Sequence, residues 1–306
     1  MLQVLLAVQL AAAIAIGALL HVQYHWSLPA AGASALGVVV LVRVLIFSNN
    51  FLLSASAAST TPAQFRPGFI GWLRLWLEEF AASMLQTSWY GPLGKARQHV
   101  FDSGATPVLL LHGYGANSAY WGALSRRLGD ELISHASVDL EPVAGSIDDY
   151  VAQVEQAVHD LCAATGASAV AIVAHSMGGL VARAWLRSHG GARLARLITL
   201  GSPHHGTVLA QFGVGVNAMQ MRRSRAGEAS SWLRALADAE TADVRARIVS
   251  IYSHQDNIVS PQSSSCLEGA RVIAFGGIGH VALGCNRRVL DCVMHELREQ
   301  LREEPR

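Results

Sequence analysis

Residues 169–179 read AVAIVAHSMGG. The first five residues are apolar and rich in valine, isoleucine and alanine, which is typical of a buried β-strand. After the glycines, the apolar residues have the character of a helix: Leu180, Val181, Ala184, Trp185 and Leu186. Ser176 therefore lies at the apex of a very tight turn, where Ala174 and Gly178 are small enough to let strand and helix approach each other. Alone, the pattern also fits an ordinary turn that contains a serine.

Strand-like and helix-like segments alternate on both sides of this turn. Strands are expected at residues 107–111, 132–140, 193–200, 248–253 and 271–275, and helices at residues 117–128 and 147–162. Such alternation predicts a mostly parallel sheet with helices on both faces. Functional loops are then expected at the carboxyl ends of the strands.

Two polar residues follow late strands in an order that suits catalysis by a serine. Asp256 comes after the strand at residues 248–253, and His280 follows the last strand in a glycine-rich loop. A serine hydroxyl is a poor nucleophile, so an imidazole must take its proton, and a carboxylate fixes the tautomer of that imidazole. We therefore interpret Ser176, Asp256 and His280 as a catalytic triad.

Other residues compete for these roles. The chain has 13 histidines, of which His204 and His205 also follow a strand. Glu240 and Asp243 are alternative acids, although they lie in a less regular region from which His280 is harder to reach. Asp256 is the preferred acid because it directly follows a strand.

The N-terminal region is unusually apolar. Residues 1–20 contain no charged side chain and are long enough to cross a bilayer as a helix. A second apolar run, residues 33–53, is interrupted by Arg43, which costs roughly 2.5–3.5 kcal/mol at the centre of a membrane. We expect one or two transmembrane helices, with an interfacial helix as the alternative for the second run. A cleaved signal peptide is a further alternative, because residues 55–57 resemble a cleavage site.

Basic residues near the apolar runs, such as Arg66 and Arg74, lie on their C-terminal side, which predicts a cytoplasmic main domain. Residues 54–64 have the Ser, Ala, Thr and Pro composition of a linker. Residues 69–85 predict a helix whose broad apolar face packs on the main domain or lies on a membrane surface. The 23 Lys and Arg nearly balance the 22 Asp and Glu, so nothing indicates a nucleic-acid partner.

Five segments now suggest a family. LHGYG (111–115), AHSMGG (174–179), TLGSPHHGT (199–207), YSHQDNIV (252–259) and GHVAL (279–283) resemble the bacterial triacylglycerol lipase and esterase branch of the α/β-hydrolase superfamily. The resemblance covers about residues 107–301. It implies that Ser176 is the nucleophile, Asp256 the acid and His280 the base, and that the N–H groups of Tyr114 and Met177 form the oxyanion hole.

The chain departs from this branch in one respect that concerns metals. Several exported lipases of the branch carry a calcium site with acidic residues close after the catalytic histidine, whereas residues 276–290 contain no Asp or Glu. No metal and no other cofactor is therefore predicted. The four cysteines also lack metal-ligand spacing. Cys266 and Cys285 could form a disulfide in an oxidising compartment, whereas free thiols fit the cytoplasm.

Together these features predict an α/β-hydrolase fold preceded by a transmembrane segment. We expect a membrane anchor in residues 1–54, a linker and amphipathic helix in residues 55–98, and a catalytic domain in residues 99–306. Within that domain, residues 208–246 are expected to form a helical cap or lid over an apolar acyl pocket. Two ordinary surface helices are the alternative for this segment.

The predicted function is a membrane-anchored serine esterase or lipase that hydrolyses acyl esters or lipids through an acyl-enzyme. The expected location is the bacterial inner membrane, with a periplasmic or secreted protein as the alternative. Acyl transfer and the hydrolysis of thioesters or amides would use the same three residues. An alternative hypothesis of a different kind is a non-catalytic, membrane-tethered binding protein with the same fold.

Overall fold

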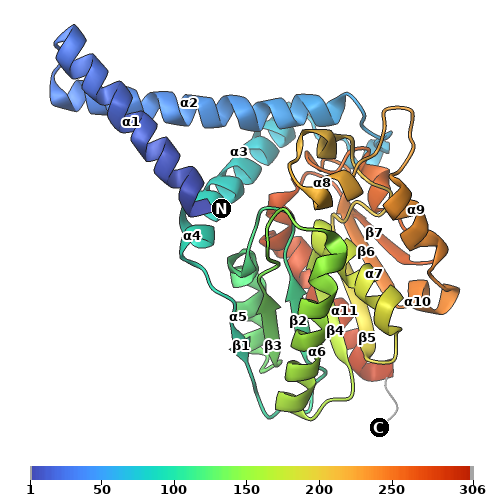
Figure 1. The fold of residues 1–306 in the computed structure, drawn as a ribbon. Coiled ribbons are helices and arrows are strands. Elements are labelled where there is room, and N and C mark those ends of the chain that lie inside the picture. The colour runs from blue at the N-terminus through green and yellow to red at the C-terminus, as the bar shows by residue number, and fades with distance from the viewer. Residues whose placement is uncertain (1, 304–306) are drawn as a thin grey trace.

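A seven-stranded sheet forms the centre of the computed structural model, which describes residues 2–303 (Figure 1). The strands are β1 (Gln98–His99), β2 (Val108–Leu111), β3 (His135–Val138), β4 (Val170–His175), β5 (Leu194–Leu200), β6 (Ile248–Ser253) and β7 (Arg271–Phe275). Their order in the sheet is β1-β3-β2-β4-β5-β6-β7, and every neighbouring pair is parallel except β1 with β3. The prediction of a mostly parallel sheet is confirmed.

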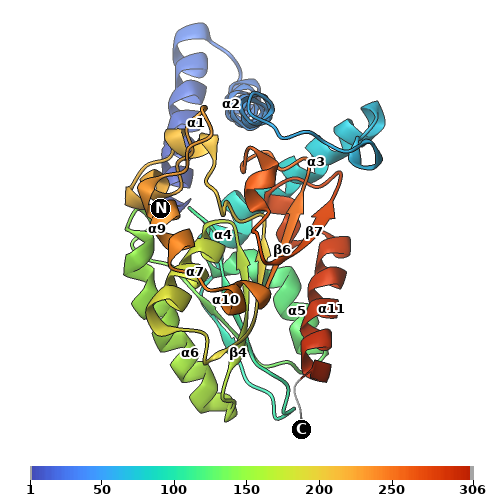
Figure 2. The same cartoon turned by 90° about the vertical axis from the view of Figure 1, so that its right-hand side faces the viewer.

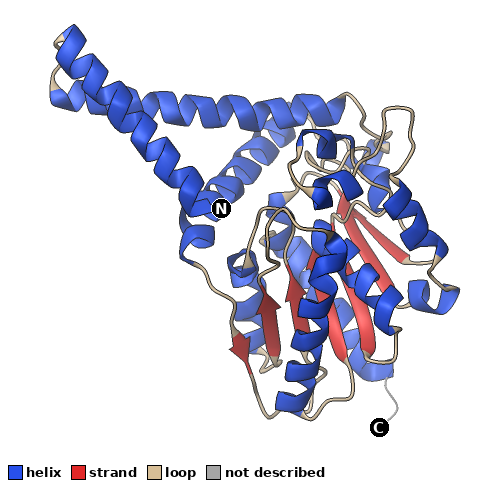
Figure 3. Cartoon of the chain, in the orientation of Figure 1, coloured by secondary structure: helices blue, strands red, loops and turns tan. Residues whose placement is uncertain are grey.

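Helices cover both faces of this sheet (Figures 2 and 3). Those of the main domain are α5 (Gly122–Asp130), α6 (Val151–Thr165), α7 (Met177–His189), α8 (Val216–Gln220), α9 (Ser231–Asp238), α10 (Ala242–Ala246) and α11 (Arg287–Glu303). Side chains alternate along each strand, so Leu109 and Ile172 pack with α6 and α7 in one core. Leu110 and Val173 pack with α5 and α11 in the other. The two cores account for the uninterrupted apolar character of β2 and β4.

The register of the central strands brings several loops to one edge of the sheet. Leu111, the last residue of β2, pairs with Ala174 of β4, and Leu200, the last residue of β5, pairs with Ile251 of β6. The loops that follow β2, β4, β5, β6 and β7 therefore meet at the carboxyl edge, as the sequence predicts.

Four helices precede the sheet: α1 (Leu2–Tyr24), α2 (Leu28–Ala55), α3 (Phe69–Leu85) and the short α4 (Gly91–Leu93). Figure 1 shows α1 and α2 as a hairpin that projects from the main domain, with the C-terminal part of α2 above the carboxyl edge of the sheet. Both helices are long and apolar enough to cross a membrane, and the most apolar windows of α1 and α2 are 0% and 17% buried in the protein. The expected helix at residues 69–85 is confirmed as α3.

Arg43 lies within α2 and has polar partners on two other segments. Its Nε atom donates a hydrogen bond to Oε1 of Gln9 in α1 at 2.9 Å. Its guanidinium group also donates to Ser88, in the helical turn that follows α3, and contacts the sulfur of Met84. These partners offset the cost of an arginine within an apolar helix, and they join α1, α2 and α3.

The segment expected to form a cap divides into two parts. Residues 208–220 lie near the carboxyl edge of the sheet, where Gly215 is close to Ala144 and the backbone of Val214 bonds to the Tyr114 hydroxyl. By contrast, α9 and α10 lie beside α7, and Leu233 and Leu236 are buried in the core on that face. A lid formed by this segment stays a prediction, and only its first part lies near the predicted site.

Candidate active site

Ser176 has a backbone conformation that few non-glycine residues adopt. It lies between β4 and α7 with φ 54° and ψ −123°, a strained combination that costs roughly 1–3 kcal/mol. The glycines after it permit close packing, since a Cβ at Gly178 would lie 2.4 Å from the carbonyl oxygen of Leu111. A Cβ at Gly179 would lie 2.1 Å from Oγ of Ser202. The strand, the tight turn and the helix predicted from residues 169–179 are therefore all present.

Asp256 and His280 are joined by a hydrogen bond in the buried loops after β6 and β7. Nδ1 of His280 lies 2.7 Å from Oδ2 of Asp256, and the two side chains are 5% and 2% exposed. The other carboxylate oxygen of Asp256 accepts the N–H groups of Ile258 and Val259 at 2.8 and 2.7 Å. These three contacts hold the carboxylate in one orientation, directed at the imidazole. An imidazole held through Nδ1 has Nε2 available as a base.

The loop after β5 brings the serine to this pair. The N–H of Ser176 donates to the carbonyl of Leu200 at 2.9 Å. The next residue, Gly201, has φ +57°, and a Cβ there would lie 3.0 Å from Oδ2 of Asp256 and 3.3 Å from Nδ1 of His280. The ring of His175, which directly precedes Ser176, lies 4.5 Å from the ring of His280. The three residues predicted as a triad therefore belong to one site.

Burial and charge act on His280 in opposite directions. Burial disfavours the charged ring, but the charge and hydrogen bond of Asp256, together with the charge of Glu79, raise the pKa of His280 above its ordinary value. His175 differs, because burial and the neighbouring His280 lower its pKa well below the ordinary value. His175 is thus neutral near pH 7, and its Nε2 lies 3.1 Å from the carbonyl oxygen of His280. It supports His280 rather than competing with it as a base.

The loop after β2 passes directly beside Ser176. A Cβ at Gly113 would lie 2.8 Å from Cβ of Ser176, so only glycine fits there. The Gly113 carbonyl lies 2.8 Å from Nδ1 of His112 and accepts the N–H of Ala116 at 3.2 Å. The N–H of Tyr114 points the opposite way, because the two groups belong to one trans peptide. Met177 is the first residue of α7, so its N–H has no partner within the helix.

The competing residues are engaged elsewhere. Glu240 forms a buried ion pair with Arg183 of α7 and a second contact with Arg245. His204 lies against Thr199 and Arg183, and burial lowers its pKa well below the ordinary value. Nε2 of His205 lies 3.0 Å from the carbonyl of Cys266. None of these contacts involves Ser176.

Sequence reasoning missed two contributions from the N-terminal region. Glu79 of α3 is fully buried, and its carboxylate accepts the N–H groups of Val281 and Ala282, directly after His280. Ser54, near the end of α2, donates from its hydroxyl to the carbonyl of Asp256 at 3.0 Å. Glu79 stands among charged residues that read as a solvent-facing stripe, and Ser54 begins a stretch with linker composition. No local pattern distinguishes either residue.

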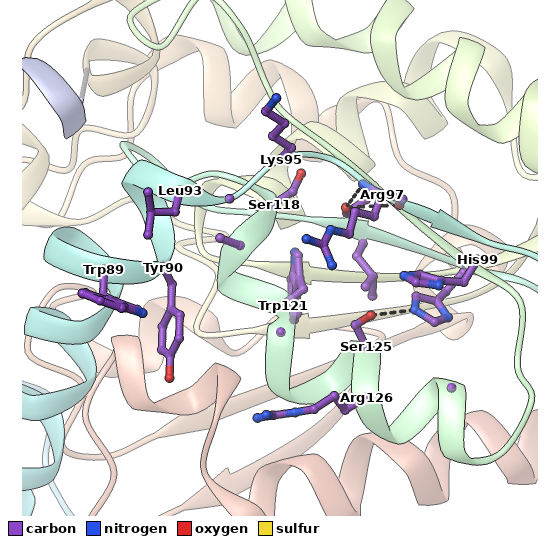
Figure 4. Close-up of a pocket in the computed structure, with 17 residues that line it drawn as sticks. Trp89, Tyr90, Leu93, Lys95, Arg97, His99, Ser118, Trp121, Ser125 and Arg126 are labelled. Carbon is purple, nitrogen blue, oxygen red and sulfur yellow. Dashed lines mark hydrogen bonds between the residues drawn. The ribbon is translucent and has the colours of Figure 1, made fainter.

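A cavity of about 540 Å³ lies apart from Ser176 (Figure 4). It is formed between residues 89–99 and α5, with Trp121 and Ser125 in its wall and the basic residues Lys95, Arg97 and Arg126 around it. Its lining includes no acidic residue and none of the three predicted triad members.

The structure also bears on the predictions about metal ligands and cysteines. Among residues 2–303 no group of three or more His, Cys, Asp or Glu side chains could hold a metal ion. Cys266 and Cys285 are free thiols in the structure, as are Cys162 and Cys292. The acid-to-base segment is therefore held by hydrogen bonds and packing.

Comparison with known proteins supports this description of the fold. A family model for palmitoyl protein thioesterase matches residues 107–262, which include Ser176 and Asp256. Among solved structures, the mature lipase BlEst2 of Bacillus licheniformis is 17% identical, with a TM-score of 0.56, over 66% of this chain and 97% of that one. Aspergillus fumigatus lipase B is 20% identical, with a TM-score of 0.53, over 63% of this chain and 53% of that one. A Bacillus anthracis bromoperoxidase is 13% identical, with a TM-score of 0.51, over 66% and 94%. At these identities the three structures show a shared α/β-hydrolase fold, which confirms the predicted fold.

Proposed function

The chain belongs to the palmitoyl protein thioesterase family, and we propose that it is a membrane-anchored serine hydrolase of acyl esters and acyl thioesters. One observation carries the proposal: a strained serine at the β4–α7 turn lies in the same site as a buried histidine bonded to a buried aspartate. This arrangement suits acyl transfer to the serine.

In the proposed first step, Nε2 of His280 takes the proton of the Ser176 hydroxyl as its oxygen attacks the acyl carbon. Asp256 stabilises the imidazolium that forms. The N–H groups of Tyr114 and Met177 donate to the oxyanion, and each such donor contributes roughly 2.7–4 kcal/mol to transition-state stabilisation. The intermediate collapses, His280 gives its proton to the leaving oxygen or sulfur, and the acyl group stays on Ser176.

In the second step, water replaces the leaving group. His280 takes a proton from water as the water oxygen attacks the acyl carbon, and it returns the proton to Ser176 when the carboxylic acid departs. With an alcohol or amine in place of water, the same steps would transfer the acyl group. The matched family favours a thioester substrate, and the acyl class covers both esters and thioesters.

Membrane anchoring is supported by exposed apolar surface. Val8, Leu10 and Leu19 of α1 are each more than half exposed, and so are Leu41 and Ile46 of α2. Apolar surface of this extent favours an apolar medium outside the protein. We expect both helices to lie in a bilayer with the catalytic domain on the cytoplasmic side. Membranes washed at alkaline pH should retain the full chain, and its release into the wash would contradict the anchor.

The function is tested with the full chain in detergent against p-nitrophenyl esters and acyl thioesters of increasing chain length. We expect turnover of at least one series, and Ser176→Ala should lower kcat by on the order of 10⁴-fold or more. Ser134→Ala serves as the matched control for an altered hydroxyl, because Ser134 is a buried serine that lies just before β3 and donates its hydroxyl to the carbonyl of Phe101, away from the site. A folded wild-type chain that cleaves neither series, even with added alcohol or amine acceptors, would support the binding-protein alternative.

A further inference from the structure

Glu79 brings a buried carboxylate from the N-terminal region to the loop that carries His280. The residue lies on α3, with no part of it exposed. Its Oε1 atom accepts the N–H of Val281 and its Oε2 atom accepts the N–H of Ala282, both at 2.8 Å. These are the first two amides after His280. The contact joins residues about 200 positions apart in the sequence.

The same carboxylate also packs against the residue before His280. A Cβ at Gly279 would lie 2.4 Å from Cδ and 2.5 Å from Oε2 of Glu79, so any side chain at this position would displace the carboxylate. Glu79 therefore contacts the chain on both sides of the histidine. A glycine-rich loop alone would be the least restrained part of the site, because glycine has the widest choice of backbone conformations.

We propose that Glu79 is a positioning residue for His280, and that the helix bearing it is in this way part of the catalytic apparatus. The inference rests on the proposed role of His280 as the base. Asn257 accepts the N–H of His280 at 3.0 Å, His175 contacts its carbonyl, and Asp256 holds its ring. Glu79 completes this set by holding the two amides that follow.

The charge of Glu79 gives it a second effect on the same residue. The titratable groups around Glu79 are His280 and Asp256 of the site, Tyr120 before α5, and Cys285 after the loop that carries His280. Burial raises the pKa of Glu79 to about 7, although the two amides and His280 favour its ionised form. Its negative charge in turn raises the pKa of His280. Glu79 thus stabilises the imidazolium that forms when His280 takes the serine proton.

If Glu79 only filled space, replacing it with a side chain of the same shape would leave activity unchanged, whereas a positioning residue would lose activity. Glutamine has nearly the same shape, so Glu79→Gln fills the same space without the charge, and its amide nitrogen would face a backbone N–H. We expect kcat/KM of this variant to fall roughly 10- to 100-fold. The acid limb of its pH profile, where kcat/KM falls as His280 becomes protonated, should move to lower pH because the pKa of His280 falls. Glu79→Asp, which keeps the charge, should leave the limb nearer to that of the wild type. Glu78→Gln is the matched control, since Glu78 is partly exposed and pairs with Arg74.

The pKa of His280 can also be measured without any turnover. NMR titration of the histidine rings in the full chain in detergent, assigned by loss of one resonance in His280→Gln, reports it directly. Gly279→Ala, which forces the carboxylate to move, provides a second perturbation from the other side of the contact. We expect a lower pKa of His280 in Glu79→Gln and Gly279→Ala, and no change in Glu78→Gln.

An unchanged His280 pKa in folded Glu79→Gln would overturn the proposal, and so would an unchanged acid limb. Failure of the proposed function has a different signature, because a wild-type chain without Ser176-dependent turnover would still show the titration of His280. A lower pKa in that case supports the coupling of Glu79 to His280 and rejects only the reaction.

Discussion

Two buried carboxylates reach His280 from two different regions of the molecule. Asp256 lies in a loop at the carboxyl edge of the sheet and bonds to the imidazole ring, whereas Glu79 lies on α3 and bonds to the backbone after it. The first contact fixes the tautomer of the ring, and the second fixes the path of the loop. One site therefore draws on two regions of the chain that follow different sequence rules.

The two regions also differ in what surrounds their apolar residues. All six residues of β4 are buried within the protein. In the apolar window of α1, by contrast, no residue is buried in the protein. The apolar residues of the sheet are thus accounted for by the two cores, whereas many of those in the helical hairpin are exposed and are expected to meet a bilayer only under the proposed membrane anchoring. Ser54 and Glu79 are two N-terminal residues that are buried and bond to the loops of the site.

Among the substitutions that compare the two carboxylates, removing the charge of Asp256 should lower kcat/KM the most. Asp256→Asn replaces an acceptor at Nδ1 of His280 with an amide, which favours the wrong tautomer and should lower kcat/KM by on the order of 10⁴-fold. Glu79→Gln should cost far less, because it leaves the ring contact in place. Steady-state kinetics on both variants measure the ratio. Equal losses would show that the two carboxylates do not divide their roles in this way.

The pH dependence of stability should single out Glu79. Burial raises its pKa from 4.5 to about 7, so its stabilising contribution is fully present below pH 4.5 and is lost as the pH rises through 7. The wild type should therefore lose about 3 kcal/mol of unfolding free energy relative to Glu79→Gln between pH 4.5 and pH 9. Chemical unfolding of both proteins in detergent at several pH values measures this difference. A constant difference across that range would mean that Glu79 is not held with a raised pKa.

Ser54 should show the smallest effect, as the contact between α2 and the acid loop. Its hydroxyl donates to the carbonyl of Asp256 and accepts a hydrogen bond from Gln262 at 3.1 Å. Ser54→Ala should lower the unfolding free energy by about 1 kcal/mol and reduce kcat/KM slightly. Ser56→Ala is the matched control, because Ser56 is exposed and its hydroxyl donates to the carbonyl of Leu53, three residues earlier in the chain. Equal stability of Ser54→Ala and Ser56→Ala would contradict a stabilising contact between α2 and the loop that carries Asp256.

Much of the hydrolase region could be predicted from the sequence, because its rules are local. Strand-like runs alternate with helices, the small residues around Ser176 indicate a tight turn, and Asp256 and His280 follow late strands. The N-terminal contributions could not be predicted in this way. Glu79 alternates with apolar residues as solvent-facing charges do, and Arg43 shows its partners Gln9 and Ser88 only when three helices meet. Such contacts depend on tertiary packing between segments that are distant in sequence.

The residue that an active-site probe modifies shows directly whether Ser176 is the nucleophile. The full-length wild type in detergent is treated with a fluorophosphonate, digested, and its peptides are analysed by mass spectrometry. We expect one adduct, on the peptide containing Ser176, with no labelling in Ser176→Ala and much slower labelling in His280→Gln. An adduct on another serine, or labelling that persists in Ser176→Ala, would contradict the assignment of Ser176 as the nucleophile.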